Sequence, residues 1–189
     1  SSCQKSGNNH LKKYVFKEDP AFRYEIVETF SGDGWKEYYI KMVSGTWLTE
    51  KEVNHTEWWH WITIVVPNNV VETEALLMIG GGSSKDQEPR KASEILINAA
   101  LGTSSIIAEI SNIPFQPLNY ANDTKDDRYE DDLIAYGWKK FLEQGAKDED
   151  IAWLARLPMT RAVVKGMDVI QKVTSDFKIT IDKFVVAGA

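Results

Sequence analysis

The stretch Lys183-Phe184-Val185-Val186-Ala187-Gly188-Ala189 decides which fold the sequence predicts. Its four consecutive apolar residues, 184–187, are typical of a central parallel strand, because such a strand is covered on both faces. Gly188 and Ala189 resemble the approach to a sharp strand-to-helix turn, where small residues leave room for an exposed reactive side chain. In that arrangement the reactive residue follows Ala189, outside this chain. The stretch therefore predicts a hydrolase-like site whose nucleophile is not among these residues.

This prediction depends on a structural condition. Residues 184–187 should lie in the middle of a sheet, with parallel neighbours on both sides. They should also lie close to the glycine-rich segment 80–82. An exposed edge position, or a distant glycine segment, would argue against an enzyme.

Composition bounds the possible classes of protein. The 189 residues suit one domain or part of a larger one, and 43% hydrophobic with 26% charged residues is ordinary for a globular protein. The formal net charge of −6 argues against nucleic acid or an anionic membrane as the main partner. No apolar run approaches the ~20 residues that span a bilayer. No residue set has the spacing of metal ligands, and we expect no cofactor.

Three short motifs bear on export. Ser1-Ser2-Cys3 resembles the end of a bacterial lipoprotein signal, in which the cysteine carries lipid, although a flexible tail over residues 1–20 is the simpler interpretation. Because Cys3 is the only cysteine, an intrachain disulfide is impossible. Asn54-His55-Thr56 and Asn122-Asp123-Thr124 match the N-glycosylation pattern, which is short enough to arise by chance.

The residue pattern changes along the chain from an antiparallel to a parallel arrangement. Strands are predicted at 22–29, 35–43, 58–66, 75–79, 105–110 and 183–187, and helices at 91–101, 130–144, 149–157 and from 158 onward. The later alternation of strand and helix indicates crossover connections in a parallel sheet. We therefore predict an α/β fold, the N-terminal part of an α/β-hydrolase domain over residues 21–189, incomplete in this chain.

Gly80-Gly81-Gly82-Ser83 is the first candidate for chemistry. In this order of elements, the loop after the third strand of such a hydrolase supplies backbone N–H groups to a developing oxyanion. We predict that Gly81, Gly82 and Ser83 form part of an oxyanion hole. A flexible turn is the alternative. A phosphate-binding loop is disfavoured because no lysine stands at the required spacing.

A second candidate is the loop 111–118, which follows the next strand. Asn112 and Gln116 could bond a substrate and Phe115 could wall its pocket. A tight loop held by asparagine and proline is the simpler interpretation, and the sequence does not decide between the two.

Two other groups of polar residues have structural explanations. The acidic residues of 126–132 precede a predicted helix, whose positive N-terminal end carboxylates stabilise. That explanation is favoured over a metal, acid–base or amine-binding role. His60 alternates with Trp58 and Ile62 on one strand face, opposite Trp59 and Trp61, and is predicted to be packed rather than catalytic.

Short motifs along nearly the whole chain form a specific combination. They are Tyr14-Val15, Asp19-Pro20, Phe22–Glu25, Trp58–Pro67, Leu76–Gly82, Asn112-Ile113-Pro114, Asp131–Trp138, Leu157–Thr160 and Val186–Ala189. In this combination the chain resembles the PhoPQ-activated pathogenicity-related proteins. The resemblance implies an α/β-hydrolase fold and export through a signal peptide. It implies a nucleophilic serine directly after Gly188-Ala189, with the acid and the histidine further on.

Three functions remain open at this point. The first is the N-terminal half of an exported serine hydrolase for an ester or peptide, completed by the C-terminal part of the same protein. The second is a non-catalytic secreted signalling or virulence-related protein that uses the hydrolase scaffold for binding. The third is a carbohydrate-binding module, which requires Trp58, Trp59 and Trp61 to be exposed.

Overall fold

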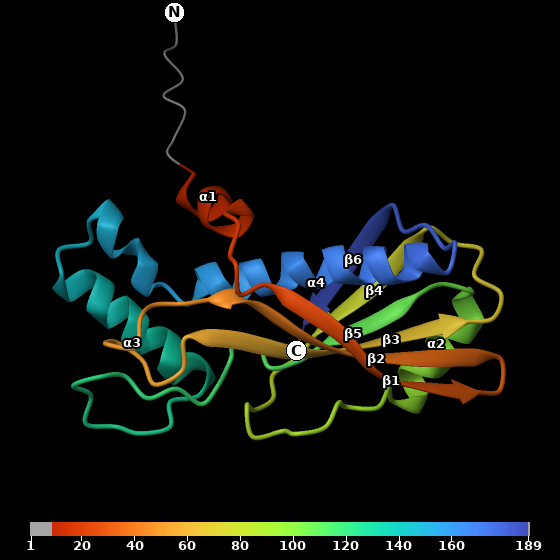
Figure 1. Ribbon diagram of the computed structural model, residues 1–189, viewed down its shortest axis with the longest axis horizontal. Helices are drawn as coiled ribbons and strands as arrows, with labels where there is room; N and C mark the ends of the chain where they lie inside the picture. Colours follow the sequence, from red (N-terminus) through yellow and green to blue (C-terminus); the bar gives the residue numbers. More distant parts are fainter. Residues whose placement is uncertain (1–8, 189) are drawn as a thin grey trace, which may run out of the picture.

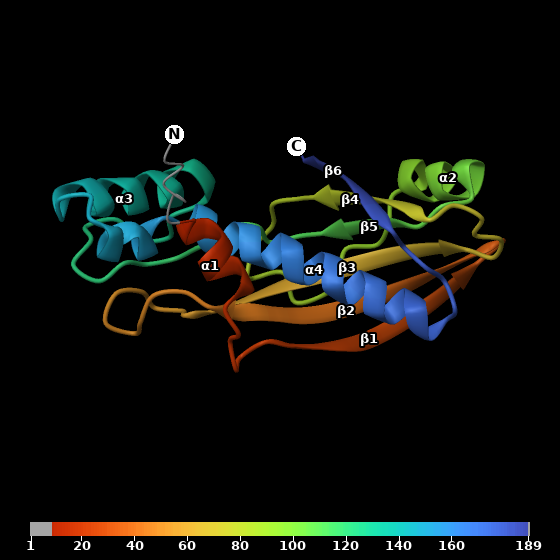
Figure 2. The ribbon, with the colours of Figure 1, turned by 90° about the horizontal axis from the view of Figure 1, so that it is seen from above.

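The computed structural model describes residues 9–188 and contains one mixed sheet with helices on both faces (Figures 1 and 2). The six strands run in the spatial order β1-β2-β3-β5-β4-β6. An α/β fold, with antiparallel strands first and parallel strands afterwards, is confirmed.

Three long strands form the antiparallel half of the sheet: β1 (Arg23–Gly32), β2 (Trp35–Thr46) and β3 (Glu57–Pro67). The β1–β2 turn is tight because Gly34 adopts a φ of 82°, which glycine reaches without a steric penalty. The register pairs Ile40 of β2 with both Ile26 and Ile62. Ile40 and Ile62 are fully buried, whereas nearly all of β1 is exposed.

The parallel half consists of β4 (Glu74–Ile79), β5 (Ile107–Ile110) and β6 (Lys183–Gly188). Helix α2 (Glu94–Thr103) provides the crossover from β4 to β5, and the parallel register places Ile79 beside Ile110. β5 then joins the two halves by pairing antiparallel with β3. β4 therefore lies between β5 on one side and β6 on the other.

Two helices cover opposite faces of the sheet. The long α4 (Arg156–Asp176) lies along one face, as Figures 1 and 2 show, and packs on the main apolar core. Its approach is close at Gly166, where a Cβ atom would lie 2.9 Å from the Ile110 side chain. α2 packs on the other face with Val65 and Ile107.

A second core lies beyond one end of the sheet. Helix α3 (Glu130–Glu143) and the 3-10 helix η1 (Asp148–Trp153) enclose it, at the left of Figure 1. Trp47 and Trp58 are buried there, with their rings 5.4 Å apart in an edge-to-face contact. This cluster adjoins the loop that follows β5, since Phe115 and Leu118 belong to it.

The expected central position of residues 184–187 is wrong for this chain. β6 is an edge strand that pairs with β4 alone among the described residues. The side chains of Val185 and Val186 are 58% and 46% exposed. One parallel neighbour is present, and no described segment covers the other side.

The predicted flexible tail is also wrong for residues 10–20. They contain helix α1 (His10–Phe16), whose Val15 is buried, with α1 lying beside α4 in Figures 1 and 2. Beyond it, Asp19 accepts hydrogen bonds from the N–H and hydroxyl of Thr46 and from Arg161 on α4. A buried ion pair therefore fixes a segment that looks polar and loose in sequence. Residues 1–8, with Cys3, lie outside the described part.

Candidate functional site

The glycine segment lies directly beside the end of β6. Gly80 follows the last residue of β4, and the parallel register pairs Ile79 with Gly188. A Cβ atom on Gly188 would lie 3.6 Å from the Ile79 carbonyl oxygen. The proximity expected between residues 80–82 and the last strand is therefore present, although Ala189 lies outside the described residues.

The peptide planes of the glycine segment are set by the loop that follows β5. The Asn112 N–H donates to the Gly81 carbonyl at 3.0 Å, and the Ile113 N–H donates to the Gly80 carbonyl at 3.3 Å. In a trans peptide the carbonyl and the next N–H point in opposite directions. The N–H groups of Gly81 and Gly82 therefore point away from residues 112 and 113. β6 ends beside the same segment, because β4 lies between β5 and β6.

Gly81 and Gly82 differ from Ser83 in whether their N–H groups are occupied. Within residues 9–188 no acceptor bonds the N–H of Gly81 or Gly82. The Ser83 N–H instead donates to the Asp86 carboxylate at 2.9 Å. Of the three predicted donors, two are free and one is engaged. Gly82 has a φ of 142°, a conformation that disfavours any other residue.

Gln116 clamps this segment from the side of β5. Its side-chain amide donates to the Gly82 carbonyl at 2.8 Å, and its side-chain oxygen accepts the backbone N–H of Glu130 at 2.7 Å. The Gln116 carbonyl also accepts the Ser84 N–H at 2.6 Å. One residue thus connects the glycine segment to the first residue of α3.

Asn112 is equally enclosed. Its side chain donates to the Trp59 carbonyl at 3.0 Å and accepts the Gln116 N–H at 3.3 Å. Asn112 and Gln116 are almost fully buried, so this conformation uses them to shape the loop, which has cis peptides before Pro114 and Pro117. Their contact with a substrate stays a prediction.

His60 lies beneath this loop. Its Nδ1 is 3.0 Å from the Asn112 carbonyl oxygen and its Nε2 is 2.9 Å from Ser44 Oγ. Because a carbonyl only accepts, the neutral ring carries its proton on Nδ1. Complete burial lowers the pKa of His60 to about 4, against hydrogen bonds from the backbone that favour the charged ring. The prediction that His60 is packed is confirmed.

The tryptophans of β3 exclude one of the open functions. Trp58 is fully buried and Trp61 is 6% exposed, while Trp59 is half-buried. Trp61 also donates its indole N–H to the Asp86 carbonyl at 3.0 Å. A carbohydrate-binding module that uses these three rings as an exposed platform is therefore ruled out.

The acidic segment before α3 is a structural ion-pair network. Arg128 bonds Asp123 and Asp132, each at 2.5 Å, and Lys125 bonds Asp132 at 2.6 Å. The first turn of α3 is acidic, as expected for the positive end of a helix. No group of side chains within residues 9–188 is arranged to hold a metal ion.

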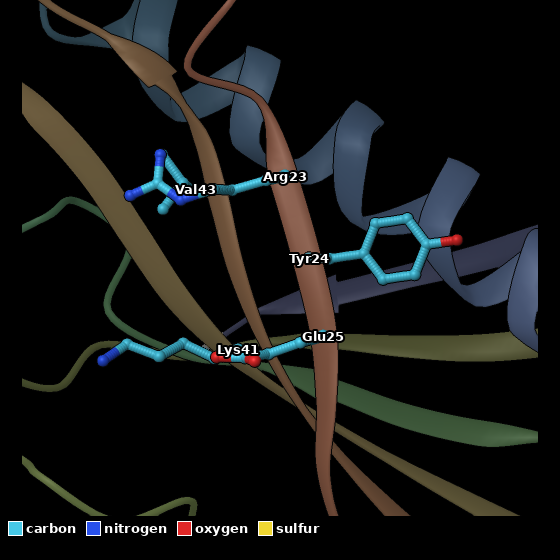
Figure 3. A pocket seen from close by; sticks show the side chains of 5 residues that line it. All are labelled: Arg23, Tyr24, Glu25, Lys41 and Val43. Carbon is cyan, nitrogen blue, oxygen red and sulfur yellow. The ribbon is translucent and has the colours of Figure 1, made fainter.

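Two hollows of the surface differ in the charges that line them. One, of about 340 Å³, lies on β1 and β2, where Arg23, Glu25 and Lys41 project to one side and Tyr24 to the other (Figure 3). The other, of about 410 Å³, lies next to the glycine segment, since Ser84 lines it. Phe115, a predicted pocket residue, contributes a wall of this second hollow.

Comparison with known proteins identifies the family of the chain. The sequence profile of the PhoPQ-activated pathogenicity-related proteins matches residues 11–189. The chain belongs to this family. A curated relative, autocrine proliferation repressor protein A of Dictyostelium discoideum, is 35% identical over 180 residues, which are 95% of the chain and 35% of that protein. The chain thus spans about a third of the length of this family relative.

Solved structures identify the fold. A crystal structure from Bacteroides fragilis, provisionally assigned as an acetyl xylan esterase, matches 93% of the chain with a TM-score of 0.51 and 12% identity. A glucuronoyl esterase from Solibacter usitatus matches 95% of it with the same score and identity. The chain covers 43% and 50% of these two proteins. The family's fold is that of the α/β hydrolases, as predicted.

Some residues that build the site were not predicted. Asp86 occupies the Ser83 N–H, and a Cβ atom on Gly81 would lie 3.0 Å from a carboxylate oxygen of Glu130. The spacing of Ser83 and Asp86 fits a polar turn, which was a possible signal. The approach of Glu130 joins distant segments, and no local pattern shows it.

In the described part of the chain, no helix is long and apolar enough to span a membrane.

Proposed function

We propose that this chain supplies the N-terminal half of an exported α/β hydrolase that cleaves an ester or peptide bond. The observation that carries the proposal is the state of the Gly81 and Gly82 N–H groups. Within residues 9–188 neither has an acceptor, both are held by the loop after β5, and their segment lies beside the end of β6. Preorganised donors of this kind stabilise the negative charge that develops on a carbonyl oxygen during acyl transfer.

The rest of the protein would supply the other catalytic groups. The nucleophile is proposed to be a serine directly after Gly188-Ala189, with the acid and the base further on. The edge position of residues 184–187 argues against an enzyme formed by this chain alone. The proposal therefore requires that the same C-terminal part cover β6, whose Val185 and Val186 are exposed in this chain. An edge strand with exposed apolar side chains readily pairs with a further strand.

Labelling of the complete protein with a fluorophosphonate probe tests the proposal, because only an activated serine reacts. The expected result is labelling that disappears when the residue after Ala189 is changed to alanine. A Gly82→Ala variant should hydrolyse p-nitrophenyl acetate more slowly by about 100-fold, since a Cβ atom at this φ disturbs an oxyanion donor. Absence of labelling in the folded, complete protein would reject the enzyme.

A second function is favoured by a specific observation, namely the 35% identity to a protein named for autocrine repression of proliferation. In this alternative the complete protein is a secreted signal or virulence-related factor, and the hydrolase scaffold serves binding alone. The same labelling experiment separates the two functions. A protein that does not react with the probe, yet acts on cells when added outside them, supports signalling.

Export leads to two further proposals about modification. Asn54 and Asn122 are both exposed, so each side chain is accessible to glycan attachment. A lipid on Cys3 is the weaker proposal, resting on Ser1-Ser2-Cys3 alone. The intact mass of the protein purified from its own cells tests both: mass removed by a glycosidase supports a glycan, and an unmodified mass rejects both.

A further inference from the structure

The hollow beside Ser84 has an aromatic and acidic lining. It holds about 410 Å³ and is lined by, among others, Glu50, His55, Glu57, Trp59, Ser84 and Phe115. Three of these side chains are aromatic rings, two are carboxylates, and no lysine or arginine lines the hollow. This combination differs from the neighbouring hollow of Figure 3, whose lining includes Arg23 and Lys41.

The three rings meet at steep angles around Phe115. The His55 and Phe115 ring centres are 6.3 Å apart with their planes at 81°, and those of Trp59 and Phe115 are 6.0 Å apart at 70°. Rings that meet edge to face present surfaces in different directions. A cation interacts favourably with the face of such a ring. Trp59 already attracts a cation, because Lys41 Nζ lies 4.8 Å from its ring centre.

The two carboxylates differ in their state of pairing. Glu57 is bound by both terminal nitrogens of Arg23, at 2.9 and 3.2 Å. Glu50 makes no hydrogen bond or ion pair with any described residue. Among the described residues, one carboxylate of the lining therefore has no ion-pair partner, while the Lys41 ammonium lies over the Trp59 ring. An apolar substrate group would leave this carboxylate without a partner, whereas a cation interacts with both the carboxylate and the aromatic rings.

We propose that this hollow binds an alkylammonium group, and that the substrate of the complete protein carries such a group on one side of its ester or peptide bond. Only the claim that the bound molecule is a substrate rests on the proposed function. The binding of a cation by the hollow stands independently. Ser84, which lines the hollow, lies two residues after Gly82, so the hollow adjoins the glycine segment.

The test uses the complete protein and two small probes of the same shape. Choline carries the cation, and 3,3-dimethylbutan-1-ol is its uncharged isostere. Isothermal titration should show that choline binds about tenfold more tightly than the alcohol, as a cation on aromatic walls requires. Glu50→Gln should abolish most of this preference, and Trp59→Leu should weaken choline binding further.

A matched control is Glu72→Gln, which removes an equally exposed carboxylate far along the chain from the hollow and should leave choline binding unchanged. Equal binding of the two probes, or a choline affinity that Glu50→Gln does not alter, would overturn the inference. Glu50 is exposed, so its variant does not endanger folding.

Hydrolysis distinguishes this inference from the proposed function. If the protein is a hydrolase with this subsite, acetylcholine should be cleaved with a kcat/KM about tenfold above that of 3,3-dimethylbutyl acetate. Choline binding without fluorophosphonate labelling would support the proposed cation site and reject the proposed enzyme activity. Labelling without choline selectivity keeps the enzyme and rejects the cation site.

Discussion

The two edges of the sheet are built differently. β1 carries three charged residues, Arg23, Glu25 and Glu28, and its register shifts between Ile26 and Glu28. Charges and a bulge are devices by which a protein terminates a sheet. β6 has a regular register, one charged residue at its start, and two exposed valines in its middle. Both edges expose apolar side chains, but β1 combines them with charges and a bulge, whereas the middle of β6 has neither.

The same contrast extends to the halves behind these edges. The antiparallel half is anchored by a buried ion pair and by the burial of most β3 side chains. The parallel half ends in exposed apolar groups and free glycine N–H groups. Mutations in the antiparallel half should therefore change the free energy of unfolding as the contacts in this structure predict. For mutations in the parallel half, the change should depend on the contacts that the remainder of the protein adds.

The largest expected effect tests the anchor of the antiparallel half. Arg161→Met in the complete protein removes the partner of Asp19, whose side chain is 10% exposed. The free energy of unfolding should fall by about 3–5 kcal/mol, because a buried carboxylate loses its ion pair. Urea denaturation measures the change. Arg156→Met, on the same helix but exposed, serves as the control and should change stability by less than about 0.5 kcal/mol.

The next largest effect concerns His60 on β3, the strand at the junction of the two halves. His60 makes the free energy of unfolding depend on pH. Its folded pKa is about 4, below the value of about 6.5 for an unfolded histidine. The unfolded chain therefore binds more protons between these values, and stability falls as pH is lowered from 6.5 to 4. The expected loss is about 3 kcal/mol, and this group adds nothing further below pH 4.

A His60→Gln variant isolates that contribution from the carboxylates that titrate in the same range. Unfolding of both proteins is measured at pH 7 and pH 4.5. The difference between the two pH values should be smaller in the variant. An equal pH dependence in both proteins would show that His60 is not buried in its neutral form.

The two edges are compared directly by matched substitutions in the complete protein. Val185→Ser should lower the free energy of unfolding by about 2 kcal/mol if the C-terminal part covers β6, because a buried valine is lost. Ile26→Ser, on an edge that stays open, should cost less than about 0.5 kcal/mol. Equal small effects would show that β6 remains exposed and that the contrast between the edges is wrong.

The smallest expected effect concerns the clamp on the free N–H groups. Gln116→Leu leaves the Gly82 carbonyl and the Glu130 N–H without their partners. Stability should fall by about 1 kcal/mol, because both groups are near enough to solvent to regain water. Hydrogen exchange over residues 80–84 should quicken. Gln144→Leu, an exposed change near the end of α3, should leave that exchange unaltered.

Local pattern was sufficient for much of the fold. The alternation in residues 22–43, the apolar run at 75–79 and the helical spacing after Pro158 each depend on neighbours within a few residues. Periodicity reports directly on such neighbours. The structure contains these elements, and the place of the glycine segment after β4 could be predicted from their order alone.

Other features were decided by contacts between distant segments. The run 184–187 has the pattern of a strand with neighbours on both sides, yet in the described sheet it pairs on one side only. Asp19 looks like part of a polar tail until Arg161, 142 residues later, binds it. An edge position and a buried ion pair both depend on which segments meet, and periodicity does not carry that information.

The sequence by itself determined the order of strands and helices, the family and the place of the glycine segment, because each is written in short-range patterns. Only the tertiary structure decided that, within residues 9–188, the Gly81 and Gly82 N–H groups have no acceptor while that of Ser83 has one. A peptide plane takes its direction from the hydrogen bonds of its carbonyl. Here those bonds come from residues 112–116, which lie beside the glycines only once β4 and β5 have paired.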